Sequence, residues 1–132
     1  MPVATVNPDI SQQRYELKTC EGGFVVLRQL SYGEQIKKQQ MAAKMTFEGQ
    51  GRGGMSGGEF EFFQRKVTEF EFATCIIEHN SEDADGKELS FKDSKTVDKL
   101  DPRVGSEIAH YISEMNDFQE EVDFLAESSV QQ

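Results

Sequence analysis

Apolar and polar residues first alternate with a period of two, over positions 15–19. A Glu-Gly-Gly turn at 21–23 follows, and an apolar run over 24–27 comes directly after it. This pattern predicts a β-hairpin, which needs a helix or a further strand against it to be stable. Residues 1–13 are polar, contain two prolines and show no periodicity, so we expect a flexible N-terminal arm there.

The apolar spacing changes to helical intervals after position 30. Ser31 and Glu34 have the spacing of a capping box, in which each side chain hydrogen-bonds the backbone N–H of the other residue. Apolar residues then recur at Tyr32, Ile36, Ala43 and Phe47. We expect a helix over about residues 32–46.

Residues 49–58 hold six glycines in ten positions and interrupt the helical pattern. Gly49, Gly51 and Gly54 match the spacing of a dinucleotide-binding fingerprint, but that fingerprint follows a strand and this one follows a helix. Read as a P-loop, the segment has Met55 where the phosphate-binding Lys belongs. We interpret 49–58 as a flexible glycine-rich loop.

A second helical pattern begins after this loop, with Ser56 and Glu59 again at capping-box spacing. Its apolar face is expected to include Phe60, Phe63, Val67, Phe70 and Ile77, with His79 at the helix end. The alternations at 59–62 and 69–72 leave strands open as the alternative.

Carboxylates surround an Asp-Gly pair within residues 75–91. Placing Gly86 at the sixth position of a calcium loop puts Lys92 at the twelfth, where a bidentate Glu is required. We therefore predict an Asp-Gly turn and a short extended piece ending at Phe91, and no metal site.

The pair Asp101-Pro102 is a strong helix start, after one or two helical turns within 93–100. An apolar stripe follows at steps of three and four, with a break expected at Asn116 and Asp117. Its members are Val104, Ile108, Tyr111, Met115, Phe118, Val122 and Leu125.

The segment beyond the break, 117–132, is an acidic amphipathic tail. A helix this short is marginal alone, so we expect it to order against an apolar groove on a sister subunit or on a partner protein. Phe118, Val122 and Leu125 are the candidate partner-binding residues.

These elements predict an α+β fold that is mostly helical, with an N-terminal β-hairpin followed by three to four packed helices. The 132 residues suit one domain, over 14–116. No apolar run approaches the length of a membrane span, and no export signal is expected. Cys20 and Cys75 fit packing thiols of a reducing compartment, with a bridge between them as the alternative.

The formal charge of −10 is concentrated in the second half of the chain. Residues 1–66 contain nine Lys or Arg and seven Asp or Glu, whereas residues 67–132 contain five and seventeen. Such a surface argues against nucleic acid and favours a basic partner or simple solubility. His79 and His110 have no metal ligands at a recognisable spacing, and no catalytic constellation is apparent, so we expect a binding protein without cofactor and not an enzyme.

The stretches "LRQLSYGE", "FEFATCIIEHNSEDADGKELSF" and "LDPRVGSEIAHYISEMNDF" resemble the tail assembly chaperones of long-tailed, non-contractile bacteriophages and prophages. The resemblance covers about residues 14–118, and the glycine cluster at 49–58 departs from it. Its motifs are structural, so they indicate a family and not a catalytic site.

The resemblance implies a protein of the host cytoplasm that keeps the tape measure protein soluble and helps to initiate tail tube polymerisation around it. Such a chaperone is then released and is missing from the mature virion. The tail tube protein is a further implied partner, and self-association stays open. A minor tail or head-tail connector component of the virion is the alternative, and a small enzyme is the least favoured one.

Overall fold

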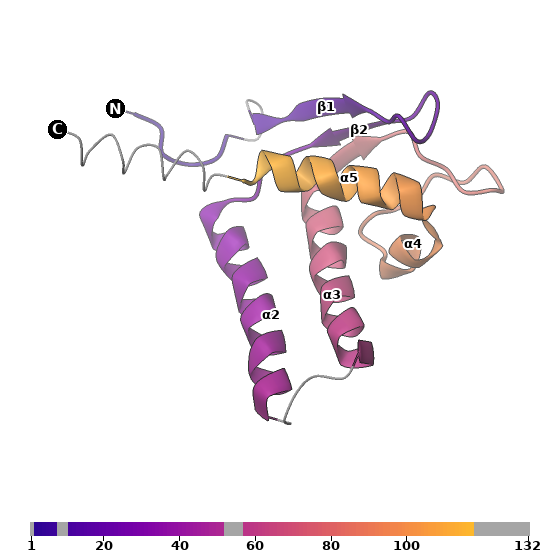
Figure 1. Ribbon diagram of the computed structural model, residues 1–132. Coiled ribbons are helices and arrows are strands. Elements are labelled where there is room, and N and C mark those ends of the chain that lie inside the picture. Colours follow the sequence, from indigo (N-terminus) through magenta and orange to yellow (C-terminus); the bar gives the residue numbers. More distant parts are fainter. Residues whose placement is uncertain (1, 8–10, 52–56, 118–132) are drawn as a thin grey trace.

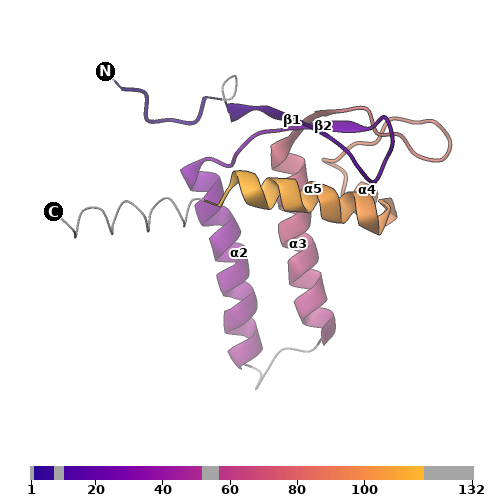
Figure 2. The ribbon, with the colours of Figure 1, turned by 45° about the horizontal axis from the view of Figure 1, so that its top comes forward.

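The computed structural model describes residues 2–7, 11–51 and 57–117. A three-stranded antiparallel sheet in the order β1-β2-β3 forms one layer, and helix α5 (Pro102–Met115) runs along it. Helices α2 (Tyr32–Gly51) and α3 (Gly57–Cys75) extend away from this layer side by side (Figure 1). Figure 2 shows α5 crossing the sheet-side part of this helix pair. The predicted α+β, mostly helical class is confirmed.

The N-terminal hairpin consists of β1 (Gln13–Glu16) and β2 (Phe24–Leu27), paired from Gln13 opposite Leu27 to Glu16 opposite Phe24. Gly22 occupies the left-handed region at φ 80°, which a side chain would disfavour. The predicted hairpin and its turn are therefore confirmed, with β1 beginning inside the segment expected to be an arm.

The third strand, β3 (Ile76–His79), corrects the sequence prediction of a helix running through Ile77. Helix α3 ends at Cys75, and the chain continues directly into a strand that pairs with β2, with a bulge between Val26 and Leu27. The β-branched pair Ile76-Ile77 favours a strand, and the open edge of β2 supplies its partner. The alternative of strands at 59–62 and 69–72 is wrong, because both segments are helical.

The glycine-rich segment contributes more helix than expected. Helix α2 continues to Gly51, and α3 already begins at Gly57, while residues 52–56, including the cap position Ser56, lie outside the described residues. Glycine weakens a helix by only about 1 kcal/mol per residue, so a helix that has already formed can extend over single glycines.

The predicted turn, short helix and helix start in the second half are confirmed. Glu82 and Glu88 form an isolated bridge around a turn in which Gly86 has φ 81°. Helix α4 (Ser94–Lys99) follows, capped by Asp93, and Asp101 caps α5 through its own side chain. Helix α5 ends at Met115, with Asn116 as its C-cap, at the predicted break.

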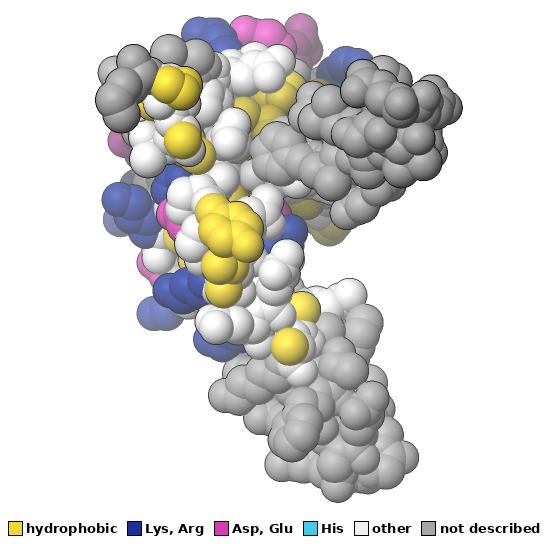
Figure 3. Space-filling model, turned by 90° about the vertical axis from the view of Figure 1, so that its left-hand side faces the viewer, with side chains coloured by type: hydrophobic (Ala, Val, Ile, Leu, Met, Phe, Trp, Pro, Cys, Tyr) yellow, Lys and Arg dark blue, Asp and Glu magenta, His cyan; other side chains and the backbone are white. Residues whose placement is uncertain are grey.

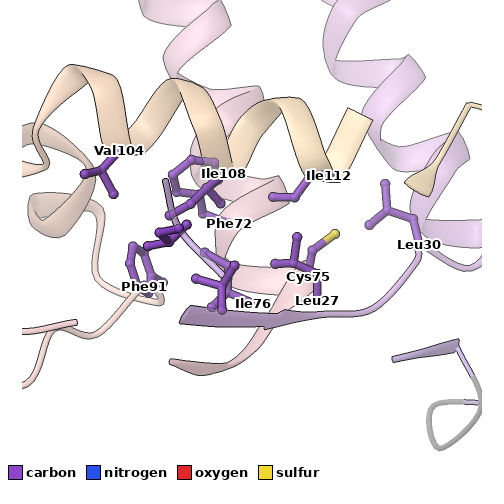
Figure 4. Packing of buried hydrophobic residues seen from close by; sticks show 11 residues of the cluster. Leu27, Leu30, Phe72, Cys75, Ile76, Phe91, Val104, Ile108 and Ile112 are labelled. Carbon is purple, nitrogen blue, oxygen red and sulfur yellow. The ribbon is translucent and has the colours of Figure 1, made fainter. Parts of the chain in front are cut away.

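The core lies between the sheet, α5 and the sheet-proximal end of α3 (Figure 4). Helix α5 contributes Val104, Ile108 and Ile112, which point toward Leu27, Phe72 and Cys75. Val104 and Ile108 belong to the predicted stripe, but Ile112 does not, and it is fully buried. The stripe residues Tyr111 and Met115 are only partly buried against the core.

Candidate partner-binding surface

Three apolar residues of α2 lie on its solvent side, and we call Tyr32, Ile36 and Ala43 the α2 stripe. Tyr32 is 82% exposed and Ile36 is 37% exposed, and Ala43 is also exposed. At 3.6 residues per turn, positions 32, 36 and 43 fall within about 40° of one another around the helix. An exposed Tyr and an exposed Ile on one helical face form a surface that an apolar partner can cover.

The opposite side of α2 faces α3. The Lys38 Nζ atom lies 3.5 Å from Glu71 Oε1, and the Lys37 ammonium lies 5.2 Å from the centre of the Phe70 ring. The stripe therefore points away from the helix pair. Figure 3 shows that face, with hydrophobic side chains over α2 and Lys and Arg side chains beside them.

The start of α2 is fixed by the capping box that the sequence predicts. The Glu34 backbone N–H donates to Ser31 Oγ at 3.3 Å, and the Ser31 N–H donates to Glu34 Oε1 at 2.9 Å. Arg28, just after β2, donates two further hydrogen bonds to the same carboxylate, at 2.9 and 2.8 Å. The pKa of Glu34 is lowered to about 2, and the hydrogen bonds from Arg28 are the largest cause of this shift. This network fixes the direction of α2 relative to the sheet.

The end of α5 is attached to the same place. The Leu30 N–H donates to Asn116 Oδ1 at 2.8 Å, and Asn116 Nδ2 donates to the Ile112 carbonyl at 2.8 Å. Asn116 therefore links the last turn of α5 to the residues that precede α2. The last described residue, Asp117, therefore lies close to the segment that precedes α2.

A concave region lies beside β3. It has a volume of about 340 Å³ and is lined by Ile76, Ile77, His79 and residues 88–92. The His79 ring lies edge-on to Phe91 at 4.7 Å, and His79 Nδ1 accepts from the Ser81 N–H at 3.1 Å. His79 is thus the last residue of strand β3, and its Nδ1 atom already accepts a hydrogen bond. The prediction that His79 lies at the end of a helix is wrong.

The acidic stretch forms the predicted turn through one of its own carboxylates. Asp83 Oδ1 accepts from the N–H groups of Asp85 and Lys87, at 2.8 and 3.0 Å. Among the described residues, no group of three or more His, Cys, Asp or Glu is arranged to hold a metal ion.

Both cysteines are free, and they differ in environment. Cys75 is a buried packing thiol, as predicted, and its burial raises its pKa to about 12. Cys20 is exposed in the hairpin turn, so the prediction that it packs in the core is wrong.

The remaining candidates divide between described and undescribed residues. Phe118, Val122 and Leu125 lie outside the described residues. His110 is exposed, as expected, with its Nε2 atom 3.0 Å from Glu114 Oε1. The sequence already contained the α2 stripe as a periodic pattern, but periodicity alone did not show which side of the helix faces solvent.

No family model, characterised protein or solved structure matches this chain. Within the described segments, no helix has the length and apolar character needed to cross a membrane.

Proposed function

We propose that this protein is a tail assembly chaperone of a long-tailed, non-contractile bacteriophage or prophage. In this proposal it works in the host cytoplasm, binds helical segments of the tape measure protein and keeps that protein soluble until the tail tube polymerises. It is then released and does not remain in the virion. The proposal rests on the resemblance of residues 14–118 and on one structural observation, the exposed α2 stripe.

The α2 stripe supports this function because it suits a helical client. Tape measure proteins are long, helical and prone to aggregate, so a chaperone must cover apolar stripes of helices. Tyr32 and Ile36 present an aromatic and a branched aliphatic side chain one helical turn apart. An apolar helix laid along α2 would bury both.

The rigid attachment of α2 also supports a binding role. The Arg28–Glu34 ion pair at 2.8 Å and the capping box hold the first turn of α2 in place before any partner arrives. A preformed surface avoids part of the entropy cost of binding. The acidic second half of the chain would keep the complex in solution through its net charge.

Co-expression tests the proposal. The chain is produced together with the long helical protein expected downstream of its gene, and the soluble fraction of that protein is compared with and without the chain. We expect most of the tape measure protein to be soluble only when the chain is present. Equal precipitation in both cases would refute the proposal. Mass spectrometry of purified virions distinguishes the alternative, since a minor tail or connector component would be present in stoichiometric amounts.

A further inference from the structure

The outer edge of β3 has no strand partner in the described part of the chain. β3 is the last strand of the sheet, and it pairs with β2 on its inner side only. The chain returns beside it after the acidic turn, where the Leu89 N–H donates to the Ser81 carbonyl and Glu82 forms a bridge with Glu88. Among the described residues, no backbone hydrogen bond joins this returning segment to residues 76–79. The outward backbone groups of β3 can therefore pair with a further strand.

The concave region beside β3 lies between this edge and residues 88–92, and we call it the β3 groove. Its lining is partly apolar. Ile76 and Phe91 belong to the core (Figure 4), Leu89 packs partly buried against them, and Ile77 is 42% exposed. A strand rises about 3.3 Å per residue, so the four residues of β3 present an edge of about 13 Å. The groove, at about 340 Å³, therefore suits a few residues of extended chain.

The charges around the β3 groove favour a basic occupant. Residues 76–92 contain five Asp or Glu and two Lys, and both Glu78 on β3 and Glu88 in the groove lining are exposed. A second copy of the chain also carries a charge of −10, and a symmetric pair of β3 strands would bring its two Glu78 side chains close together. A segment with Lys or Arg side chains is attracted instead of repelled.

We propose that the β3 groove binds an extended, basic segment of a partner protein as a fourth strand of the sheet. The segment pairs with the outer edge of β3 through main-chain hydrogen bonds. Its successive side chains point to opposite sides, so the apolar ones contact Ile77 and Leu89, while the Lys or Arg ones lie near Glu78 and Glu88. This site is separate from the α2 stripe, which suits a helical segment, and it does not depend on the proposed function.

A labelled peptide of about eight residues, in which Val alternates with Lys or Arg, tests the site without any natural partner. Its binding to the full chain is measured by fluorescence anisotropy at physiological salt, and we expect saturable binding. The same peptide with Glu in place of Lys and Arg should bind at least about fivefold more weakly.

Methylated peptides test whether the main chain pairs with β3. N-methyl groups on the Val amides in one peptide, and on the Lys and Arg amides in another, each remove the donors along one edge of the added strand. We expect at least one of the two to bind about tenfold more weakly than the unmodified peptide, because its main-chain hydrogen bonds to β3 are lost.

Two variants of the chain locate the binding site. Glu78→Lys places a positive charge on β3, and Glu16→Lys makes the same change of charge on β1, the opposite edge strand. We expect Glu78→Lys to weaken binding of the basic peptide at least about fivefold and Glu16→Lys to leave it within about twofold. Both side chains are exposed and lie outside the core cluster, so thermal melting should be unchanged. Hydrogen exchange of the unmodified chain gives a second readout, since bound peptide should slow exchange within residues 76–79.

Several results would overturn the proposal. Equal weakening by Glu78→Lys and Glu16→Lys would show that the peptide responds to net charge alone. Equal affinities of the unmodified and both methylated peptides would exclude strand addition, and unchanged exchange at residues 76–79 with peptide bound would place the peptide elsewhere. Protection of residues 76–79 on concentrating the chain alone would assign the edge to a second copy. The variant Tyr32→Lys/Ile36→Lys should bind the peptide like the unmodified chain, and weaker binding would contradict the separation of the two sites.

Discussion

The carboxylate of Glu107 on α5 binds the backbone of Thr19 in the hairpin turn. Glu107 Oε1 accepts from the Thr19 N–H at 2.9 Å and from Thr19 Oγ1 at 2.6 Å. The Lys18 N–H and the Tyr111 hydroxyl donate to the same carboxylate, at 2.8 and 2.6 Å to Oε2. One side chain of α5 thus holds the hairpin turn in register with the helix that covers the sheet.

Replacing this carboxylate should loosen the hairpin turn. In Glu107→Gln the side-chain amide presents N–H groups to backbone and hydroxyl donors that need an acceptor. We therefore expect the free energy of unfolding at pH 7 to fall by about 1 kcal/mol. This value is at the low end for hydrogen bonds to a charged group, because the site is near the surface. Native-state hydrogen exchange should accelerate at Lys18 and Thr19. Glu114→Gln on the same helix is the control, and equal effects of the two variants would contradict this role.

The stability of the protein should fall as the pH drops below about 5. Burial opposes ionisation of Glu107, but its hydrogen bonds from Lys18, Thr19 and Tyr111 outweigh this and lower its pKa to about 2, and the pKa of Glu34 also lies at about 2. A carboxylate with a depressed pKa stabilises the fold fully above its unfolded pKa, and the stabilisation is lost as the pH falls toward the folded value. Urea unfolding between pH 7 and pH 2 measures this loss. The double variant Glu34→Gln/Glu107→Gln should show a flatter profile across this window, and an unchanged profile would contradict the assignment.

Shortening a central core residue of α5 should destabilise the whole domain. Ile108 is fully buried, and Ile108→Ala removes apolar contacts and leaves a cavity, so we expect a loss of about 2–5 kcal/mol in the free energy of unfolding. Chemical denaturation checks this value. Ser106→Ala, at an exposed position of the same helix, should change stability by less than about 0.5 kcal/mol.

Cys20 should react with thiol reagents while Cys75 is protected in the folded protein. Cys20 is exposed and Cys75 is fully buried with a pKa of about 12, so one thiol per chain should be labelled at pH 8. Labelling in denaturant should give two. Rapid labelling of both thiols without denaturant would show that the core around Cys75 opens readily.

The sequence predicted those elements whose geometry is specified by residues close together in the chain. Ser31 with Glu34, Gly22 in its turn, and Asp101 with Pro102 each specify a backbone geometry through neighbouring residues. The helix starts, the hairpin and the end of α5 at Asn116 were predictable for this reason.

The features that depend on distant contacts were not predictable. Ile76 and Ile77 continue a helical pattern, and only the open edge of β2 turns them into a strand. Likewise, the spacing of Tyr32 and Ile36 does not show that α3 lies on the other side of α2. The exposed stripe emerges only when the Lys38–Glu71 and Lys37–Phe70 contacts fix that side.

The affinity of the purified chain for its tape measure protein, measured with stripe variants, tests the central claim most directly. The double variant Tyr32→Lys/Ile36→Lys places charges on the α2 stripe, and Gln40→Lys/Ala42→Lys adds the same charges at exposed α2 positions that flank it. We predict that the stripe variant binds at least about tenfold more weakly, which corresponds to about 1.4 kcal/mol, while the control binds like the unmodified chain. Equal affinities for all three proteins, with unchanged thermal melting, would contradict the account.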